Sequence, residues 1–251
     1  MCKKLVFGIP LLLILLIGGG LLYLNFNLNA LVKAAIEKYG SQVTLTDVSV
    51  SNVDISLRDG TGSVSGFKIG NPHSFVSAKA VDMDSMTLVL DTKTITGTGP
   101  LVIKKITVEA PQIDYEVDAK GNDNLRTLQR NISSFSSKRA GAEKSNAQKK
   151  MSRNVIIKDL YINRGKITAT HALLKGEVIE AELSPIHMTN IGSGKGIPPE
   201  QVAKIVLNEV VNNAAKSSKA AVAKEKIYNK IDDAVGKETG GAVKNLVEDL
   251  F

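Results

Sequence analysis

Few side chains of this chain have the types and spacing that metal binding or catalysis requires. The three histidines, His73, His171 and His187, are far apart, and none has a second ligand at a spacing such as His-x-x-x-His. Asp82 and Asp84 lie two positions apart on a predicted strand, a pair that can bind metal but is also typical of a water-facing strand surface. We predict structural or surface roles for these five residues, and no metal or cofactor.

Other patterns that could indicate chemistry are incomplete. Residues 118–124 resemble the start of a calcium loop, but the sixth position lacks the required Gly and the twelfth lacks the Glu. The sequence contains no Gly-x-Ser-x-Gly, no P-loop and no Gly-x-Gly-x-x-Gly. We therefore predict that the protein is not an enzyme.

An apolar segment near the N-terminus predicts a membrane anchor. Residues 5–24 carry no charge, and 20 residues at a rise of 1.5 Å match the ~30 Å core of a bilayer. Gly18 and Gly20 also permit a cleaved signal peptide, but the apolar run continues through Leu24 and favours an uncleaved anchor. Lys3 and Lys4 place the N-terminus in the cytoplasm, which predicts a single-pass inner-membrane protein with a periplasmic body.

The composition indicates an aliphatic core and few specific partners. The 251 residues include 4% aromatics and no Trp, and the single cysteine, Cys2, excludes an internal disulfide. The net charge of +7 is consistent with a solvated surface or with attraction to anionic lipid headgroups. No basic stripe alternates with aromatic residues, so we expect no nucleic-acid partner.

Alternating apolar residues predict roughly eight strands in the middle of the chain. In residues 43–57 the apolar phase changes between Val50 and Val53, which a strand accommodates only through a bulge or bend. Asp59-Gly60 predicts a hairpin turn. The further strands are expected at 63–69, 78–91, 101–109, 112–118, 155–162, 166–171, 177–183 and 186–191.

Residues 112–118 indicate that one face of the sheet is dry. Ile113, Tyr115 and Val117 point to one side, whereas Asp114, Glu116 and Asp118 point to the other. We predict a curved, one-sided antiparallel sheet whose apolar face forms a groove. The residues that we expect to line this face are Val53, Ile55, Leu57, Leu88, Leu90, Ile113, Tyr115 and Val117.

Helical patterns flank the predicted sheet. A short amphipathic helix is expected after the anchor, ending at Gly40, and a long Ala- and Lys-rich helix is expected from Pro199 to about Val235. The polar residues 133–153 are interpreted as a mobile insert or frayed helix. The predicted organisation is an anchor at 1–27, a β domain at 28–191 and a helical tail at 192–251, in a mainly β fold with helices.

Two stretches within residues 40–128 resemble the N-terminal region of the AsmA-like proteins, a family of membrane-anchored periplasmic proteins related to TamB. The first stretch, 68–92, contains Asn71-Pro72 followed by alternating apolar residues from Met86 to Leu90. The second, 106–128, contains Ile106 to Ile113 and then Asp118, Gly121, Asn122 and Leu125. The chain differs from larger members of the family in its shorter β region and its helical tail.

The resemblance implies a taco-shaped sheet with an apolar groove, along which larger relatives are thought to pass phospholipid. The expected partners are thus the membrane, phospholipid and, through the C-terminal helix, another envelope protein. The alternative is a scaffolding protein whose sheet is an ordinary packed core and whose C-terminal helix binds a protein partner. The sequence leaves both open.

Overall fold

The structure is a computed structural model that describes residues 28–95, 97–142, 153–171 and 178–235. Its ten strands are β1 (Val48–Ser49), β2 (Asn52–Ser56), β3 (Thr61–Gly70), β4 (Lys79–Leu90), β5 (Leu101–Glu109), β6 (Gln112–Val117), β7 (Val155–Asn163), β8 (Gly165–His171), β9 (Val178–Leu183) and β10 (Ile186–Ile191). The helices are residues 28–44, α2 (Thr92–Ile95), α3 (Asn124–Ala142) and α4 (Pro199–Val235). The fold is therefore mixed α/β, with a mostly antiparallel sheet.

The ten strands form one sheet in which several long strands are interrupted. One edge of β4 pairs with β3, while its other edge pairs with β5 near its end and with β6 near its start. Two pairings, β5 with β7 and β6 with β8, are parallel. The prediction of a wholly antiparallel sheet is wrong at these pairs, because the segment containing α3 crosses over between β6 and β7 and so returns the chain in the same direction.

A line of backbone irregularities crosses the middle of the sheet. Gly66, Ala110 and Arg164 have positive φ angles of 59°, 48° and 53° and lie where the pairing of β3 with β4 skips one residue and where β5–β6 and β7–β8 are interrupted. A Cβ at Gly66 would lie 2.2 Å from Ser51 Oγ, so this close approach requires glycine. The Ser51 N–H points to the carbonyls of Ser65 and Gly66, at the phase change that the sequence predicts between Val50 and Val53.

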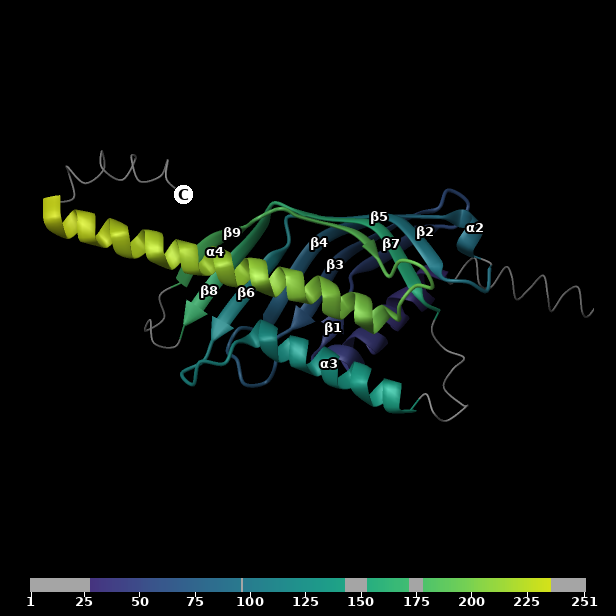
Figure 1. Cartoon of the computed structure of the whole chain (residues 1–251), viewed down its shortest axis with the longest axis horizontal. Coiled ribbons are helices and arrows are strands. Elements are labelled where there is room, and N and C mark those ends of the chain that lie inside the picture. Colours follow the sequence, from purple (N-terminus) through teal and green to yellow (C-terminus); the bar gives the residue numbers. More distant parts are fainter. Residues whose placement is uncertain (1–27, 96, 143–152, 172–177, 236–251) are drawn as a thin grey trace, which may run out of the picture.

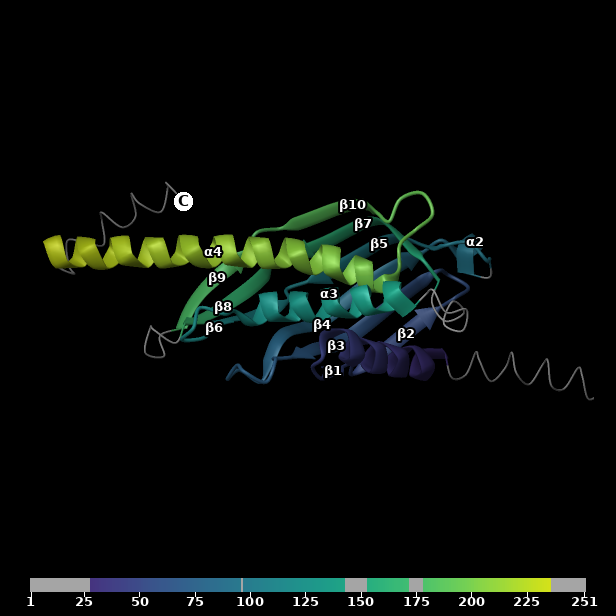
Figure 2. The same cartoon turned by 60° about the horizontal axis from the view of Figure 1, so that its bottom comes forward.

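Three helices cover one face of the sheet. Figures 1 and 2 show residues 28–44, α3 and α4 side by side on this face, which we call the inner face. Cross-strand partners share a face, and one row of them is apolar across six strands. This row consists of Val53, Val64, Met86, Val108, Ile162 and Ile186. The three helices and the apolar side chains of the inner face enclose the main core.

The helix ends differ in part from the expectations. The first helix continues past Gly40 to residue 44, because the Thr44 hydroxyl donates to the Gly40 carbonyl (2.8 Å) and Ser41 Oγ accepts the Val48 N–H (2.9 Å). α3 extends to Ala142, so residues 133–142 of the predicted insert are helical. α4 spans 37 residues from Pro199 to Val235, as predicted.

Candidate functional site

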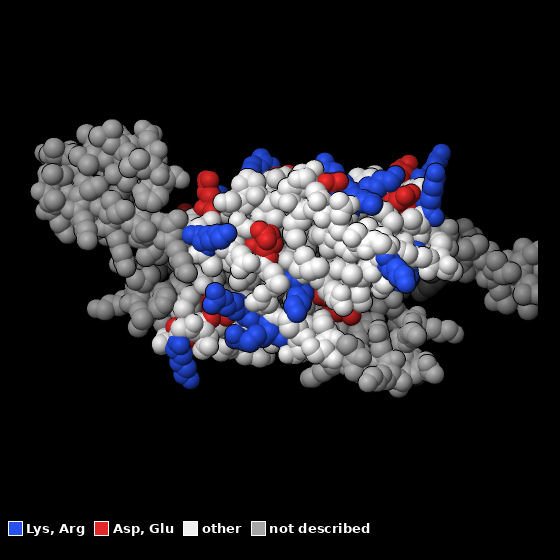
Figure 3. Space-filling model, in the orientation of Figure 1, with Lys and Arg blue, Asp and Glu red and all other residues white. Residues whose placement is uncertain are grey.

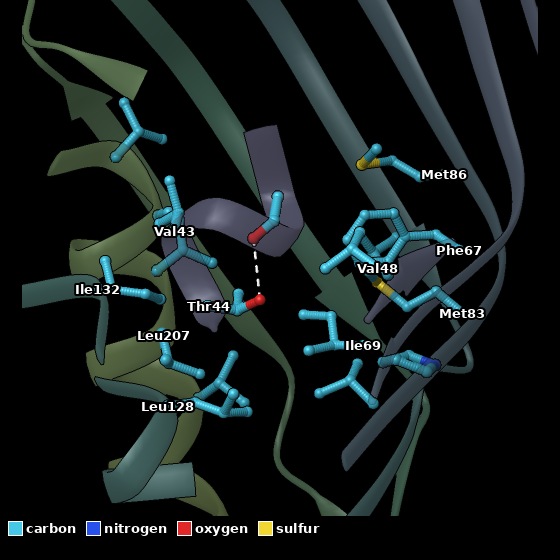
Figure 4. A pocket seen from close by; sticks show the side chains of 18 of the residues that line it. Val43, Thr44, Val48, Phe67, Ile69, Met83, Met86, Leu128, Ile132 and Leu207 are labelled. Carbon is cyan, nitrogen blue, oxygen red and sulfur yellow. Dashed lines mark hydrogen bonds between the residues drawn. The ribbon is translucent and has the colours of Figure 1, made fainter. Parts of the chain in front are cut away.

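A cavity of about 420 Å³ lies between the inner face of the sheet and the three helices. The helices contribute Ile36, Val43, Leu128, Ile132, Val206 and Leu207 to its wall, and the sheet contributes Phe67, Ile69, Met83, Met86, Ile106 and Ile113 among others. Figure 4 shows the two groups of side chains facing each other across this space. Close-packed interiors contain few voids larger than a water molecule, and this volume lies in the range of small-molecule sites.

The wall is almost entirely apolar. Thr44 satisfies its hydroxyl locally on the Gly40 carbonyl (Figure 4). The Tyr39 hydroxyl donates to Glu200 Oε2 at 2.7 Å, and Glu200 is only 3% exposed in the first turn of α4. Among the described residues that line the cavity there is no Lys or Arg. The described wall suits hydrocarbon and offers no cation for a phosphate group.

The eight predicted groove residues are not gathered into one site. Ile113 lines the cavity and is 2% exposed. The strand register places Val53, Ile55, Leu88 and Leu90 on the inner face, in rows with cavity residues of β4, β5 and β7. Val53 and Ile55 belong to a small separate cluster with Val50 and Val64.

Of the eight predicted residues, only Ile113 belongs to the described cavity wall, and Leu57, Tyr115 and Val117 are also absent from the inner-face rows described above. Leu57 is in the β2–β3 turn and is 39% exposed. Tyr115 and Val117 continue along β6 beyond Ile113 and are half-buried. Burial raises the pKa of the Tyr115 hydroxyl. The lipid-facing role of all eight residues stays a prediction.

Sequence reasoning missed most of the cavity wall because three helices supply half of it. Alternation within strands identifies a dry face, but it does not reveal which helices cover that face or leave space beneath them. The apolar stripe of α4, which includes Val202, Val206 and Val210, was the available signal. Met83 and Met86, two flexible side chains well suited to an irregular wall, both lie on β4 and line the cavity.

A buried polar cluster brings together the loop after β3, strand β6 and the start of α3. Asn124 is fully buried, and its side chain accepts the Glu116 N–H (3.0 Å) and donates to Asn71 Oδ1 (3.0 Å) and to the Asp114 carbonyl (2.6 Å). The Glu116 carboxylate accepts the N–H groups of Val76 (2.7 Å) and Ser77 (3.0 Å). The prediction that Glu116 faces water is therefore wrong, because the 71–77 loop covers it and leaves it 8% exposed.

The Asp118–Asn122 loop prepares the start of α3. Asp118 Oδ1 accepts the N–H groups of Lys120 and Asn122, both at 2.8 Å. The hydrogen bond from the Asn122 side chain, assisted by these N–H groups, lowers the pKa of Asp118. Asp123 then caps α3 by accepting the Arg126 N–H at 2.7 Å. This loop is therefore a hydrogen-bonded turn that leads into α3.

The polar face of β4 carries ion pairs. Asp82 contacts Lys79 and lies 3.7 Å from Lys68, with its side chain only 12% exposed. The prediction that Asp82 lies on a water-facing surface is confirmed only in part, because Lys68 and Lys79 cover its side chain. Nearby, burial raises the pKa of Asp114, and the positive charge of Lys79 partly offsets this increase. Within the described ranges no three His, Cys, Asp or Glu residues are grouped as metal ligands.

The described histidine side chains, His73 and His187, lie outside the cavity wall. The His187 ring stacks on Tyr161 with centroids 4.2 Å apart, and its Nε2 lies 3.0 Å from Asp159 Oδ1 on the exposed side of β7 and β10. His73 is exposed in the β3–β4 loop, and the side chain of His171 lies outside the described residues. On the face seen in Figure 3, basic and acidic side chains are interspersed and form no patch of one sign.

No family model and no curated protein matches this chain. The described residues form a ten-stranded mixed sheet with a helix-covered apolar cavity. No helix within the described part of the chain has the length and apolarity to cross a bilayer, and the predicted anchor at 5–24 lies outside that part.

Proposed function

We propose that this chain is a membrane-anchored envelope protein of AsmA-like type that binds lipid hydrocarbon in its apolar cavity and helps to move phospholipid, without catalysis. The observation that carries this proposal is the 420 Å³ cavity between the dry sheet face and the helices. A buried methylene gains ~0.8 kcal/mol on leaving water, and this interaction needs no directional polar group. A hydrocarbon occupant would therefore account for a large apolar wall without a chemical motif.

The membrane setting of the proposal rests on the sequence. The uncharged segment 5–24 would anchor the chain in the inner membrane, with the described body in the periplasm. Ile36, which lines the cavity, follows the end of this segment by 12 residues in the sequence. The bends across the sheet would curve it into the expected groove, with the helices over the groove's opening.

A photoreactive hydrocarbon tests this proposal. The full chain would be reconstituted in phosphatidylcholine vesicles containing a hexadecyl diazirine, irradiated and mapped by peptide mass spectrometry. We expect labels on the cavity wall at Val202 to Val210 and on β4. Val206→Phe, which places a larger side chain in the cavity, would reduce them at least fivefold, whereas Val89→Phe on the exposed side of β4 would not. An unlabelled wall in the wild-type chain would refute lipid binding.

The second candidate is a scaffolding protein, and the length of α4 favours it. This helix covers the sheet beside β9 and then extends past it, as Figure 1 shows at the yellow end. In that case α4 would bind a protein partner and the sheet would serve as its support. Site-specific crosslinkers along residues 222–235 would then capture one stoichiometric partner in the membrane, while the cavity wall would acquire no hydrocarbon label.

A further inference from the structure

The volume and the wall of the cavity together restrict the lipid that it would hold. An engineered apolar cavity of ~150 Å³ accommodates benzene, with six carbon atoms. By this measure the 420 Å³ cavity would accommodate about 17 carbon atoms. That is one long alkyl or acyl chain, and about half of the hydrocarbon of a two-chain phospholipid.

The wall also indicates which part of the lipid enters. A buried phosphate needs charge-assisted hydrogen bonds from Lys, Arg or a row of backbone N–H groups. The described wall has no Lys or Arg, and its acidic residue, Glu200, is hydrogen-bonded to Tyr39. A phosphate or carboxylate headgroup would therefore stay outside, where it keeps its hydration.

We infer that the cavity binds the chain of a single-chain lipid of about 16 to 18 carbons, such as a lysophospholipid, in preference to a two-chain phospholipid. This inference rests on the proposed lipid-binding function and specifies its ligand. A two-chain lipid would leave its second chain outside the cavity. Compared with the bilayer, where both chains are buried, each methylene of the second chain that is exposed to water would cost ~0.8 kcal/mol. That cost is about a fourfold loss in binding for each methylene.

Matched photoreactive lipids test the inference on the full chain in phosphatidylcholine vesicles. One probe is palmitoyl lysophosphatidylcholine and the other is dipalmitoyl phosphatidylcholine, each with a diazirine at the end of one chain. We expect the lysolipid to label the peptide containing Val202 to Val210 once per protein molecule, and at least fivefold more than the two-chain probe. Val206→Phe would reduce this label at least fivefold, and Val89→Phe would leave it unchanged.

Unlabelled lysophosphatidylcholines of increasing chain length provide a second readout. Competition should strengthen with length up to about 16 to 18 carbons and then level off, because longer chains no longer fit. Equal labelling of the wall by both probes, or competition that rises beyond 20 carbons, would overturn the single-chain inference while leaving lipid binding in place. No labelling by these probes or by hexadecyl diazirine would overturn both.

Discussion

Asn71 and Asn124 are 53 positions apart in the chain, yet Asn124 Nδ2 donates directly to Asn71 Oδ1 at 3.0 Å. Asn71 precedes the Pro72 break after β3, and Asn124 is the first residue of α3. Their contact fastens the β3–β4 loop to β6 and to the helix that covers the cavity.

We predict that Asn124→Ala lowers the free energy of unfolding by about 2 to 4 kcal/mol, since it leaves the buried Glu116 N–H and Asp114 carbonyl without their partner. Urea unfolding of the full chain in mild detergent, followed by circular dichroism, measures this. Asn212→Ala, at an exposed position on α4, is the control and should change stability by less than about 0.5 kcal/mol. Similar effects of the two substitutions would show that the cluster contributes little.

The predicted apolar residues should differ sharply in their tolerance of charge. Ile113→Asp places a carboxylate in the cavity wall, where Ile113 is 2% exposed, and should cost at least about 4 kcal/mol or prevent folding. Leu57→Asp, in a turn and 39% exposed, should cost less than about 1 kcal/mol. Thermal unfolding of both variants makes the comparison. A tolerated Ile113→Asp would contradict the placement of Ile113.

The helix at residues 28–44 protects one edge of the sheet with its side chains. Asn29 Oδ1 accepts the Ile55 N–H and Glu37 Oε1 accepts the Val50 N–H, both at 3.0 Å. Glu37→Ala should therefore increase hydrogen exchange at the Val50 amide about tenfold, the equivalent of ~1.4 kcal/mol. Glu37→Gln retains an acceptor and should stay close to wild type. Equal exchange in the two variants would mean that Glu37 does not protect this edge.

We predict that ionisation of Asp114 lowers the stability of the folded protein as the pH rises. Burial raises its pKa in the folded protein, so the folded state binds a proton more readily than the unfolded state. The free energy of unfolding therefore falls as the pH rises from the unfolded pKa of Asp114, ~3.9, through its raised folded pKa. Above the folded pKa the full cost of ionising the buried Asp114 carboxylate is present.

Asp114→Asn removes this titration. Its stability relative to wild type should rise between about pH 4 and pH 7, as measured by urea unfolding at each pH. Asp47→Asn, at an exposed position, is the matched control for general charge effects. A difference between Asp114→Asn and wild type that is constant with pH would rule out the proposed cost of ionisation.

The sequence was sufficient where local pattern determines structure. Alternation located the strand at 101–109, and Pro199 marked the start of α4, because these signals depend on neighbouring residues. It was insufficient where distant segments meet. The parallel pairing of β5 with β7 depends on the path through α3, and the burial of Glu116 depends on a loop 40 positions away. The cavity depends on three helices whose packing no single segment specifies.

Native mass spectrometry of the full chain, with lipid extraction of the same sample, tests whether the cavity holds a lipid. The chain would be purified from membranes in mild detergent, exchanged into a volatile buffer and compared with its Val206→Phe variant. We expect about one retained lipid per folded wild-type molecule and a marked loss in the variant. A homogeneous, folded wild-type chain without lipid would contradict this expectation and would favour the scaffolding alternative.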